Sequence, residues 1–176
     1  MDIQNGLYHQ WNQRRGRFAF VTGTIVEELP ERTRGNSADG CILYFSVEDE
    51  NGNMVTIQML PDTYVVDFEP LSVGSKCQFW YNLDTPMPLI YPPRYQAVAA
   101  AQLKQGRMID VDFYNDALVN SAFTLELNLD GSVQIRTANN QYFQGNPAGH
   151  VLVVQYSSST RSIPAQTTPE KIAVLC

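Results

Sequence analysis

The chain has 176 residues, of which 44% are hydrophobic and 17% charged, and its formal net charge is −6. This composition is typical of a folded protein and excludes a disordered chain of low hydrophobicity and high charge. Acidic residues outnumber basic ones by 12 to 7 in residues 1–100 and by 6 to 5 in residues 101–176. Neither part has the basic face that several phosphate contacts require, so the sequence disfavours nucleic acid as a partner.

Nothing in the sequence predicts a membrane span, because no run of about 18 apolar residues is present. The first residues have neither the basic nor the apolar region of a signal peptide. This predicts a cytoplasmic protein, or a secreted one if a leader has been removed. The three cysteines, Cys41, Cys77 and Cys176, are widely spaced and favour reduced, core-type thiols over a disulfide framework.

The chain begins with a polar segment, residues 1–19, which we expect to be an N-terminal arm. Residues 18–26 are apolar and β-branched and predict a strand. The polar, glycine-containing residues 31–40 predict an exposed loop.

Two hairpins are expected further along the chain. Residues 41–47 and 54–59 flank Asn51-Gly52, a dipeptide that is the strongest short signal for a hairpin. Residues 122–127 and 133–136 flank a Leu-Asp-Gly turn and predict a second hairpin. Residues 95–105 are compatible with a helix or with a strand that leads into a linker.

The chain also resembles itself at an offset of 75 residues, which becomes 76 after one slip. The matched pairs, in order, are Phe68 and Phe143, Gly74 and Gly149, Tyr81 and Tyr156, Thr85 and Thr160, Pro88 and Pro164, Pro93 and Pro169, Ala97 and Ala173, and Val98 and Val174. Both expected hairpins precede these landmarks in the same order. We therefore predict two modules, residues 20–100 and 107–176, joined by a linker at 101–106.

The repeated part consists of an alternating strand, a proline-bearing excursion and a short closing strand. The alternating strands are expected at residues 77–81 and 151–156, and the closing strands at 97–98 and 172–175. Because proline cannot donate to a β-ladder, we expect each excursion to leave the sheet and to carry the chain from one edge of a small barrel to the other. Short strands joined in this way are typical of OB-like or SH3-like barrels. The predicted fold class is all-β, with two tandem small OB-like barrels that pack on each other or on a partner.

The second tail, YSSSTRSIPAQTTPEKIAV at residues 156–174, resembles the closing segment of β-barrel modules of Firmicutes found beside copper-amine-oxidase-like stalk domains. Residues 62–67 (DTYVVD) are similar to an Asp-Thr-x-Ile-x-Asp segment of the same modules. The first tail departs from the pattern, since residues 85–93 lack its Ser and Gln. The resemblance implies a non-catalytic accessory or binding module and brings no catalytic residues with it.

The candidate ligand-binding residues are Trp80, Tyr91, Arg94 and Tyr95, which come from the first alternating strand and the excursion after it. Exposed on one face, these side chains could stack against sugar rings, bases or apolar side chains. The alternative is that the aromatic residues fill the barrel or an interface, as small barrels require large side chains.

No residue pattern indicates catalysis, a metal site or a cofactor. His9 and His150 have no partner at ligand spacing. Asp110 and Asp112 alternate with apolar residues, which predicts a solvated face of an edge strand rather than an acid–base pair. Asp49-x-Asn51-x-Asn53 lacks the later ligands of a calcium loop and is interpreted as the hairpin turn. The small basic clusters at 14–17 and 32–34 are expected to balance nearby glutamates.

These features together predict a non-enzymatic interaction or assembly module, with a homo-oligomer or another protein as its partner. The alternative function is a ligand-binding module that uses the aromatic face for carbohydrate or single-stranded nucleic acid.

Overall fold

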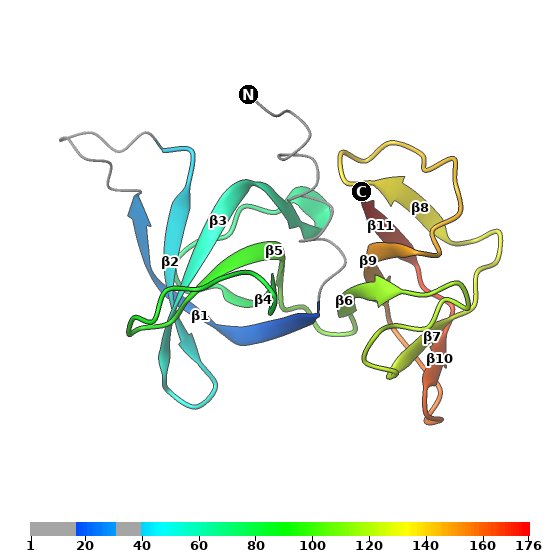
Figure 1. Ribbon diagram of the computed structural model, residues 1–176, viewed down its shortest axis with the longest axis horizontal. Coiled ribbons are helices and arrows are strands. Elements are labelled where there is room, and N and C mark those ends of the chain that lie inside the picture. Colours follow the sequence, from blue (N-terminus) through cyan, green and yellow to red (C-terminus); the bar gives the residue numbers. More distant parts are fainter. Residues whose placement is uncertain (1–16, 31–39) are drawn as a thin grey trace. The chain divides into compact units, whose positions relative to one another are not determined.

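The structure is a computed structural model and describes residues 17–30 and 40–176 (Figure 1). The described chain forms two compact units, one of Ala19–Leu103 and one that includes Lys104–Cys176, called here the first and second modules. The only helical element of the described residues is a short 3₁₀ turn, η1 (Val66–Phe68). The predicted all-β class is confirmed. No described helix has the length and apolar character needed to cross a membrane.

The first module is a closed five-stranded barrel with the order β1-β2-β3-β5-β4 (Figure 1). Its strands are β1 (Phe18–Pro30), β2 (Leu43–Asp49), β3 (Met54–Val65), β4 (Lys76–Asn82) and β5 (Arg94–Gln102). β1 and β2, β2 and β3, and β4 and β5 pair in antiparallel fashion, whereas β3 and β5 run parallel. Between β1 and β4 the barrel is joined by bonds from Ile25 N to Ser75 O (3.0 Å) and from Gly74 N to Ile25 O (2.8 Å).

The barrel interior is filled by alternate residues of all five strands, as period-two patterning requires. Its buried members are Ile25, Phe45, Val47, Val55, Ile57, Cys77, Phe79, Ala97 and Ala100. The first predicted hairpin is confirmed, since β2 and β3 pair around Asp49, whose Oδ1 accepts bonds from the backbone N–H groups of Asn51 and Asn53, both at 2.9 Å. The calcium-like spacing is therefore a hydrogen-bonded turn.

The second module consists of two sheets. A four-stranded sheet has the order β6-β9-β11-β8, and β7 and β10 form a parallel pair. The strands are β6 (Met108–Tyr114), β7 (Leu125–Leu127), β8 (Gln134–Thr137), β9 (His150–Tyr156), β10 (Ala165–Thr167) and β11 (Lys171–Leu175). The core between them contains Tyr114, Leu125, Leu127, Leu152, Val154, Ile172 and Val174. The closed barrel seen in the first module is thus replaced here by two separate sheets.

The second predicted hairpin is wrong. The chain does turn at Asp130, whose Oδ1 accepts the N–H of Ser132 at 2.8 Å. The flanking strands nevertheless separate, because β7 pairs with β10 and β8 pairs with β11, both in parallel. Local turn chemistry is the same in both arrangements, and the partners that decide between them lie more than 30 residues later in the chain.

The sequence predicts that each excursion carries the chain from one edge of a barrel to the other, and this prediction is wrong. β4 and β5 are antiparallel neighbours, and so are β9 and β11. Each excursion is therefore a long loop between adjacent strands, and the second contains β10, which pairs with β7. Prolines in these segments stop ladder pairing, but they do not require a change of edge.

The two modules share one strand pattern. In the first, the order β3-β5-β4-β1 has a parallel β3/β5 pair followed by an antiparallel β5/β4 pair. In the second, β8-β11-β9-β6 has a parallel β8/β11 pair followed by two antiparallel pairs. The matched strands occur in the same sequence order within their modules.

Several predicted boundaries can be compared with the strands. β1 includes Phe18 and Ala19, the last two residues of the expected arm, and β5 extends through Gln102 into the expected linker. Residues 95–102 are strand rather than helix. Of the three cysteines only Cys77 is a buried core residue, whereas Cys41 and Cys176 are exposed. Residues 1–16 of the arm and residues 31–39 of the loop lie outside the described residues.

Candidate functional site

The four predicted binding residues occupy different environments. Trp80 is only 2% exposed and packs against Phe20, with ring centroids 6.2 Å apart. Tyr95 is half-buried, and its ring stacks on that of Tyr81 at 4.0 Å and an interplanar angle of 11°. Burial, followed by the neighbouring Tyr95 hydroxyl, raises the pKa of Tyr81 to about 12. One face of each tyrosine ring is therefore covered by the other.

Arg94 lies at the start of β5, opposite Thr56 of β3. Its guanidinium carbon is 5.0 Å from the ring centroid of Tyr44, within the range of a cation–π interaction. The Tyr44 hydroxyl also accepts a long bond from Gln58 Nε2 at 3.5 Å. Arg94 thus covers an aromatic face on the outside of the barrel.

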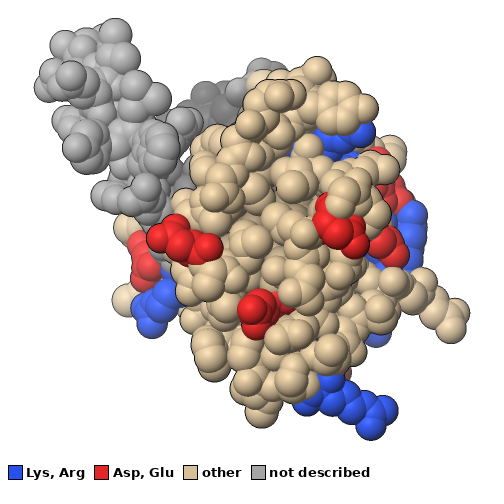
Figure 2. Space-filling model, turned by 90° about the vertical axis from the view of Figure 1, so that its right-hand side faces the viewer, with Lys and Arg blue, Asp and Glu red and all other residues tan. Residues whose placement is uncertain are grey.

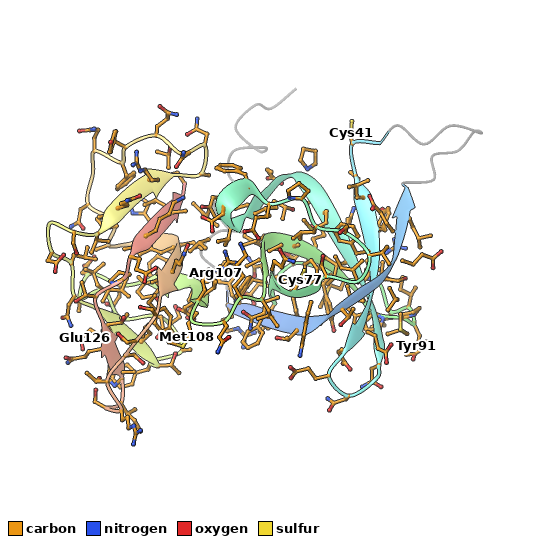
Figure 3. All side chains as sticks on the ribbon, turned by 180° about the vertical axis from the view of Figure 1, so that it is seen from behind. Cys41, Cys77, Tyr91, Arg107, Met108 and Glu126 are labelled. Carbon is orange, nitrogen blue, oxygen red and sulfur yellow. The ribbon has the colours of Figure 1, made fainter. Side chains whose placement is uncertain are left out.

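Tyr91 differs from the other three, because 83% of its surface is exposed. It belongs to the loop of residues 83–93 between β4 and β5, which we call the apolar loop. Figure 3 shows Tyr91 at the periphery of the barrel, well away from Cys77 in its interior. The large side chains of the apolar loop that are exposed are Leu83, Met87, Leu89, Ile90 and Tyr91.

This concentration of exposed apolar surface is unusual. The described residues include fourteen exposed large hydrophobic side chains, and five of them belong to this one loop. At about 200 Å² for one fully exposed large side chain, the five together expose roughly 600 Å². The largest contiguous apolar patch on a typical monomer is about 300–600 Å². Patches of this size mark interaction surfaces more often than isolated surface leucines do.

The apolar loop is fixed at both ends. Asn82, which is buried, accepts the backbone N–H of Asp84 on its side-chain oxygen at 2.8 Å and that of Thr85 on its carbonyl at 3.2 Å. At the other end Thr56 N donates to Pro93 O at 2.9 Å. Four of the eleven residues are prolines, which restrict φ throughout the loop.

The corresponding loop of the second module, residues 157–164, is built differently. It is polar, and hydroxyl groups organise it. Thr160 Oγ1 accepts the N–H of Gln166 at 2.8 Å, Ser162 Oγ donates to Pro164 O at 2.9 Å, and Thr167 Oγ1 donates to Ser158 O at 2.6 Å. The single large exposed apolar side chain that the structure records in this segment is Ile163.

Asp110 and Asp112 are not on a solvated face, contrary to the prediction from their alternation. Asp112 is 6% exposed and accepts the N–H groups of Phe113 (2.8 Å) and Ala122 (3.0 Å). Asp110 is half-buried, and its Oδ2 accepts bonds from the Tyr114 hydroxyl and from Asn120 Nδ2 (3.2 Å). The alternating pattern concealed this, because the donors come from the following loop.

Burial is the main cause that raises the pKa of both carboxyl groups, and their hydrogen bonds oppose it. Burial, together with the charge of Asp110, raises the pKa of Tyr114 as well. Every donor described for these acids is a group of the module itself. The arrangement acts as a structural network that holds residues 115–125 against β6.

The remaining charged and polar features do not form a ligand site in the described residues. A hollow of about 350 Å³ lies beside the β2–β3 turn and is lined by Gly23, Thr24, Val26, Glu48, Asp49, Glu50 and Lys76. Within the described ranges, no group of three or more His, Cys, Asp and Glu side chains is arranged to hold a metal ion. His150 packs edge-on against Phe143, and its Nδ1 lies 3.1 Å from Ala148 O.

Basic side chains are scattered rather than grouped. On the face drawn in Figure 2, uncharged residues predominate, and the Lys and Arg side chains of the described residues lie toward the margins. His9 and all but Arg17 of the basic clusters at 14–17 and 32–34 lie outside the described residues.

Comparisons of the chain with protein-family models, with curated proteins and with solved structures give no match.

Proposed function

We propose that this chain is a non-enzymatic interaction module whose contact surface is the apolar loop. The observation that carries the proposal is the presence of five exposed large apolar side chains on this loop of eleven residues. Leu89 is fully exposed and Tyr91 nearly so, and burying such side chains is the main source of binding free energy at protein interfaces. The occupant is another protein or a second copy of the chain.

The fold of the first module supports this role. A closed barrel with the order β1-β2-β3-β5-β4 and a parallel β3/β5 pair is the pattern of an OB-like barrel, as we infer it. Barrels of this kind bind ligands with their loops and with one outer sheet face, and the rigid core holds these loops in position. The apolar loop joins the last two strands of such a barrel.

We also propose that the two modules are tandem copies of one unit. The shared strand order and the eight ordered identities support duplication. In this interpretation the two corresponding loops diverged. The loop between β4 and β5 became apolar in the first copy, and the loop after β9 became polar in the second. A loop that differs in character between two copies of one strand pattern is expected where a surface has acquired a specific partner.

The aromatic-platform alternative, with carbohydrate or single-stranded nucleic acid as ligand, has less support. Stacking a sugar or base requires an accessible ring face. Trp80 is buried, Tyr95 and Tyr81 cover each other, and Arg94 covers Tyr44. Only Tyr91 among the predicted residues combines an aromatic ring with high exposure, and its neighbours on the loop are aliphatic.

A photo-crosslinking amino acid tests the proposal directly. We would introduce p-benzoyl-phenylalanine at position 89 and, as a matched control, at position 163, which is similarly exposed at 88% on the polar loop. The proposal expects crosslinks in cells to a defined protein surface from position 89 and a much lower yield from position 163. Sedimentation velocity of the purified chain then distinguishes a second copy from another protein. Equal yields at both positions would refute the proposal.

A further inference from the structure

The charge distribution of the first module narrows the kind of partner that the apolar loop can accept. The described residues of Ala19–Leu103 include nine Asp and Glu side chains but only two Lys and Arg side chains, Lys76 and Arg94. The barrel therefore has a net charge of −7 over these residues. The second module has six acids and five bases, a net charge of −1.

Most of these acids lie at the surface. Seven of the nine are exposed, namely Glu27, Glu28, Glu48, Glu50, Asp62, Asp67 and Asp84. Asp84 belongs to the apolar loop itself. Glu48 is opposite Met54, which is two residues before Thr56, and Thr56 N is bonded to Pro93 O at the end of the loop. Met54 and Thr56 are about 7 Å apart along β3, which is less than the screening length of about 8 Å at physiological salt. The β2–β3 turn and the Pro93 end of the loop therefore adjoin neighbouring parts of the same strand.

The described cations do not neutralise this field. Lys76 forms an exposed ion pair with Glu50, with an N–O distance of 3.8 Å. Arg94 is directed over the Tyr44 ring. We propose, on the basis of the function proposed above, that the apolar loop binds a basic protein segment, in which aliphatic or aromatic side chains alternate with Lys or Arg.

The same charges disfavour a second copy as the occupant. A symmetric dimer through the apolar loop would bring two barrels of net charge −7 together, and like charges across an interface reduce both the association rate and the affinity. A basic segment instead buries its apolar side chains on the loop while its cations face the surrounding carboxylates. The apolar contacts provide affinity, and the charges provide orientation and selectivity.

The test uses the full chain and two fluorescein-labelled probe peptides, each with three Leu separated by Gly and Ser. One peptide has four Lys and the other has four Glu in the same positions. Fluorescence anisotropy measures their binding to the wild-type chain, to a Leu89→Ser/Tyr91→Ser variant, to an Ile163→Ser control and to a Glu48→Gln/Glu50→Gln variant. Circular dichroism and thermal unfolding establish that each variant is folded.

The Lys peptide is expected to bind at least about tenfold more tightly than the Glu peptide. The double serine variant should weaken its binding about tenfold or more, because two exposed anchors are lost, and Ile163→Ser should leave it unchanged. The glutamine variant and an increase in NaCl from about 50 to 500 mM should each weaken binding severalfold.

Other outcomes separate this inference from the function on which it rests. Equal binding of both peptides, lost in the serine variant, overturns the basic partner and leaves the loop as an interaction surface. Peptide binding that survives in the Leu89→Ser/Tyr91→Ser variant contradicts both the basic partner and the apolar loop as the contact surface. Failure of the Lys peptide to bind, together with self-association that the serine variant abolishes, overturns the inference in favour of a second copy.

Discussion

Replacing Asn120 by alanine tests whether the second module depends on its buried polar network. The Asn120 side chain is 3% exposed, and all of its hydrogen-bonding capacity is used. Its Oδ1 accepts the N–H groups of Thr124 (2.8 Å) and Leu125 (3.0 Å), and its Nδ2 donates to Thr124 Oγ1 (2.8 Å) and Asp110 Oδ2 (3.2 Å). Alanine removes four bonds, whose partners are the buried Leu125, the half-buried Asp110 and the exposed Thr124.

The expected loss in the free energy of unfolding follows from these four hydrogen bonds. At about 1 kcal/mol for each bond, the loss is about 4 kcal/mol, and relaxation of the loop into water reduces it to about 3. A module of about 70 residues has a free energy of unfolding of roughly 4–10 kcal/mol. Asn120→Ala should therefore remove a third or more of the stability of this module.

The assay must report on the second module alone. Residues 104–176 contain no tryptophan, so fluorescence is unsuitable. Hydrogen exchange of residues 108–175, measured by mass spectrometry across a urea series, gives the free energy of unfolding of this segment. Exchange of the first module in the same sample is the internal reference.

Asn115→Ala is the matched control, because Asn115 Oδ1 also accepts two backbone N–H groups, those of Ala117 (2.9 Å) and Val119 (3.1 Å), but is exposed. We expect a cost of about 1 kcal/mol there, since water can replace these bonds. Asn120→Asp keeps the acceptors but adds a carboxylate beside Asp110, so its cost should be greater at pH 7 than at pH 5. If Asn120→Ala costs no more than the control, the network is not a principal support of the module.

Three further predictions concern titration, thiol chemistry and close packing. Because burial raises the pKa of Asp110 and Asp112, the folded state binds protons more readily than the unfolded state. The free energy of unfolding should therefore rise as pH falls from 7 toward about 4. In urea titrations, an Asp110→Asn/Asp112→Asn variant should show a smaller change in the free energy of unfolding with pH. Burial raises the pKa of the Cys77 thiol to about 11, so at pH 8 mass spectrometry should find it unalkylated by iodoacetamide in the native chain and alkylated in urea. Gly23→Ala should destabilise the barrel by about 2 kcal/mol or more in denaturant unfolding, because a Cβ there would lie 2.4 Å from Glu48 O; an unchanged midpoint would contradict this close approach.

The parts of the fold that could be predicted from sequence are those set by short-range chemistry. Asn51-Gly52 and the Asp49 side chain specify the first hairpin within a few residues, and the structure has it. The alternating residues of β4 and β9 gave correct strands for the same reason. Partners of β7 and β8 could not be predicted, because both pair in parallel with strands far along the chain and no local pattern specifies such pairs.

The candidate site was predicted only in part, and the reason is also physical. Alternation tells which residues share a face but not whether a second layer covers that face. Trp80 therefore looked available for stacking, although it is buried, and Asp112 looked solvated, although loop N–H groups enclose it. The sequence indicated Tyr91 as exposed surface in the excursion, but not its aliphatic neighbours Leu89 and Ile90, because a stacking surface requires aromatic rings.

The two loops show two ways of ordering a long connection between adjacent strands, and only one leaves apolar side chains exposed. Residues 157–164 are held by hydroxyl-to-backbone bonds, which require Ser or Thr at several positions. Residues 83–93 rely on prolines, which restrict the backbone without using side chains and so leave the other positions open to large apolar residues. A loop ordered before binding loses little conformational entropy when a partner arrives. Exposed leucine and tyrosine on such a loop do not stabilise the barrel, so their contribution is expected in a complex rather than in folding.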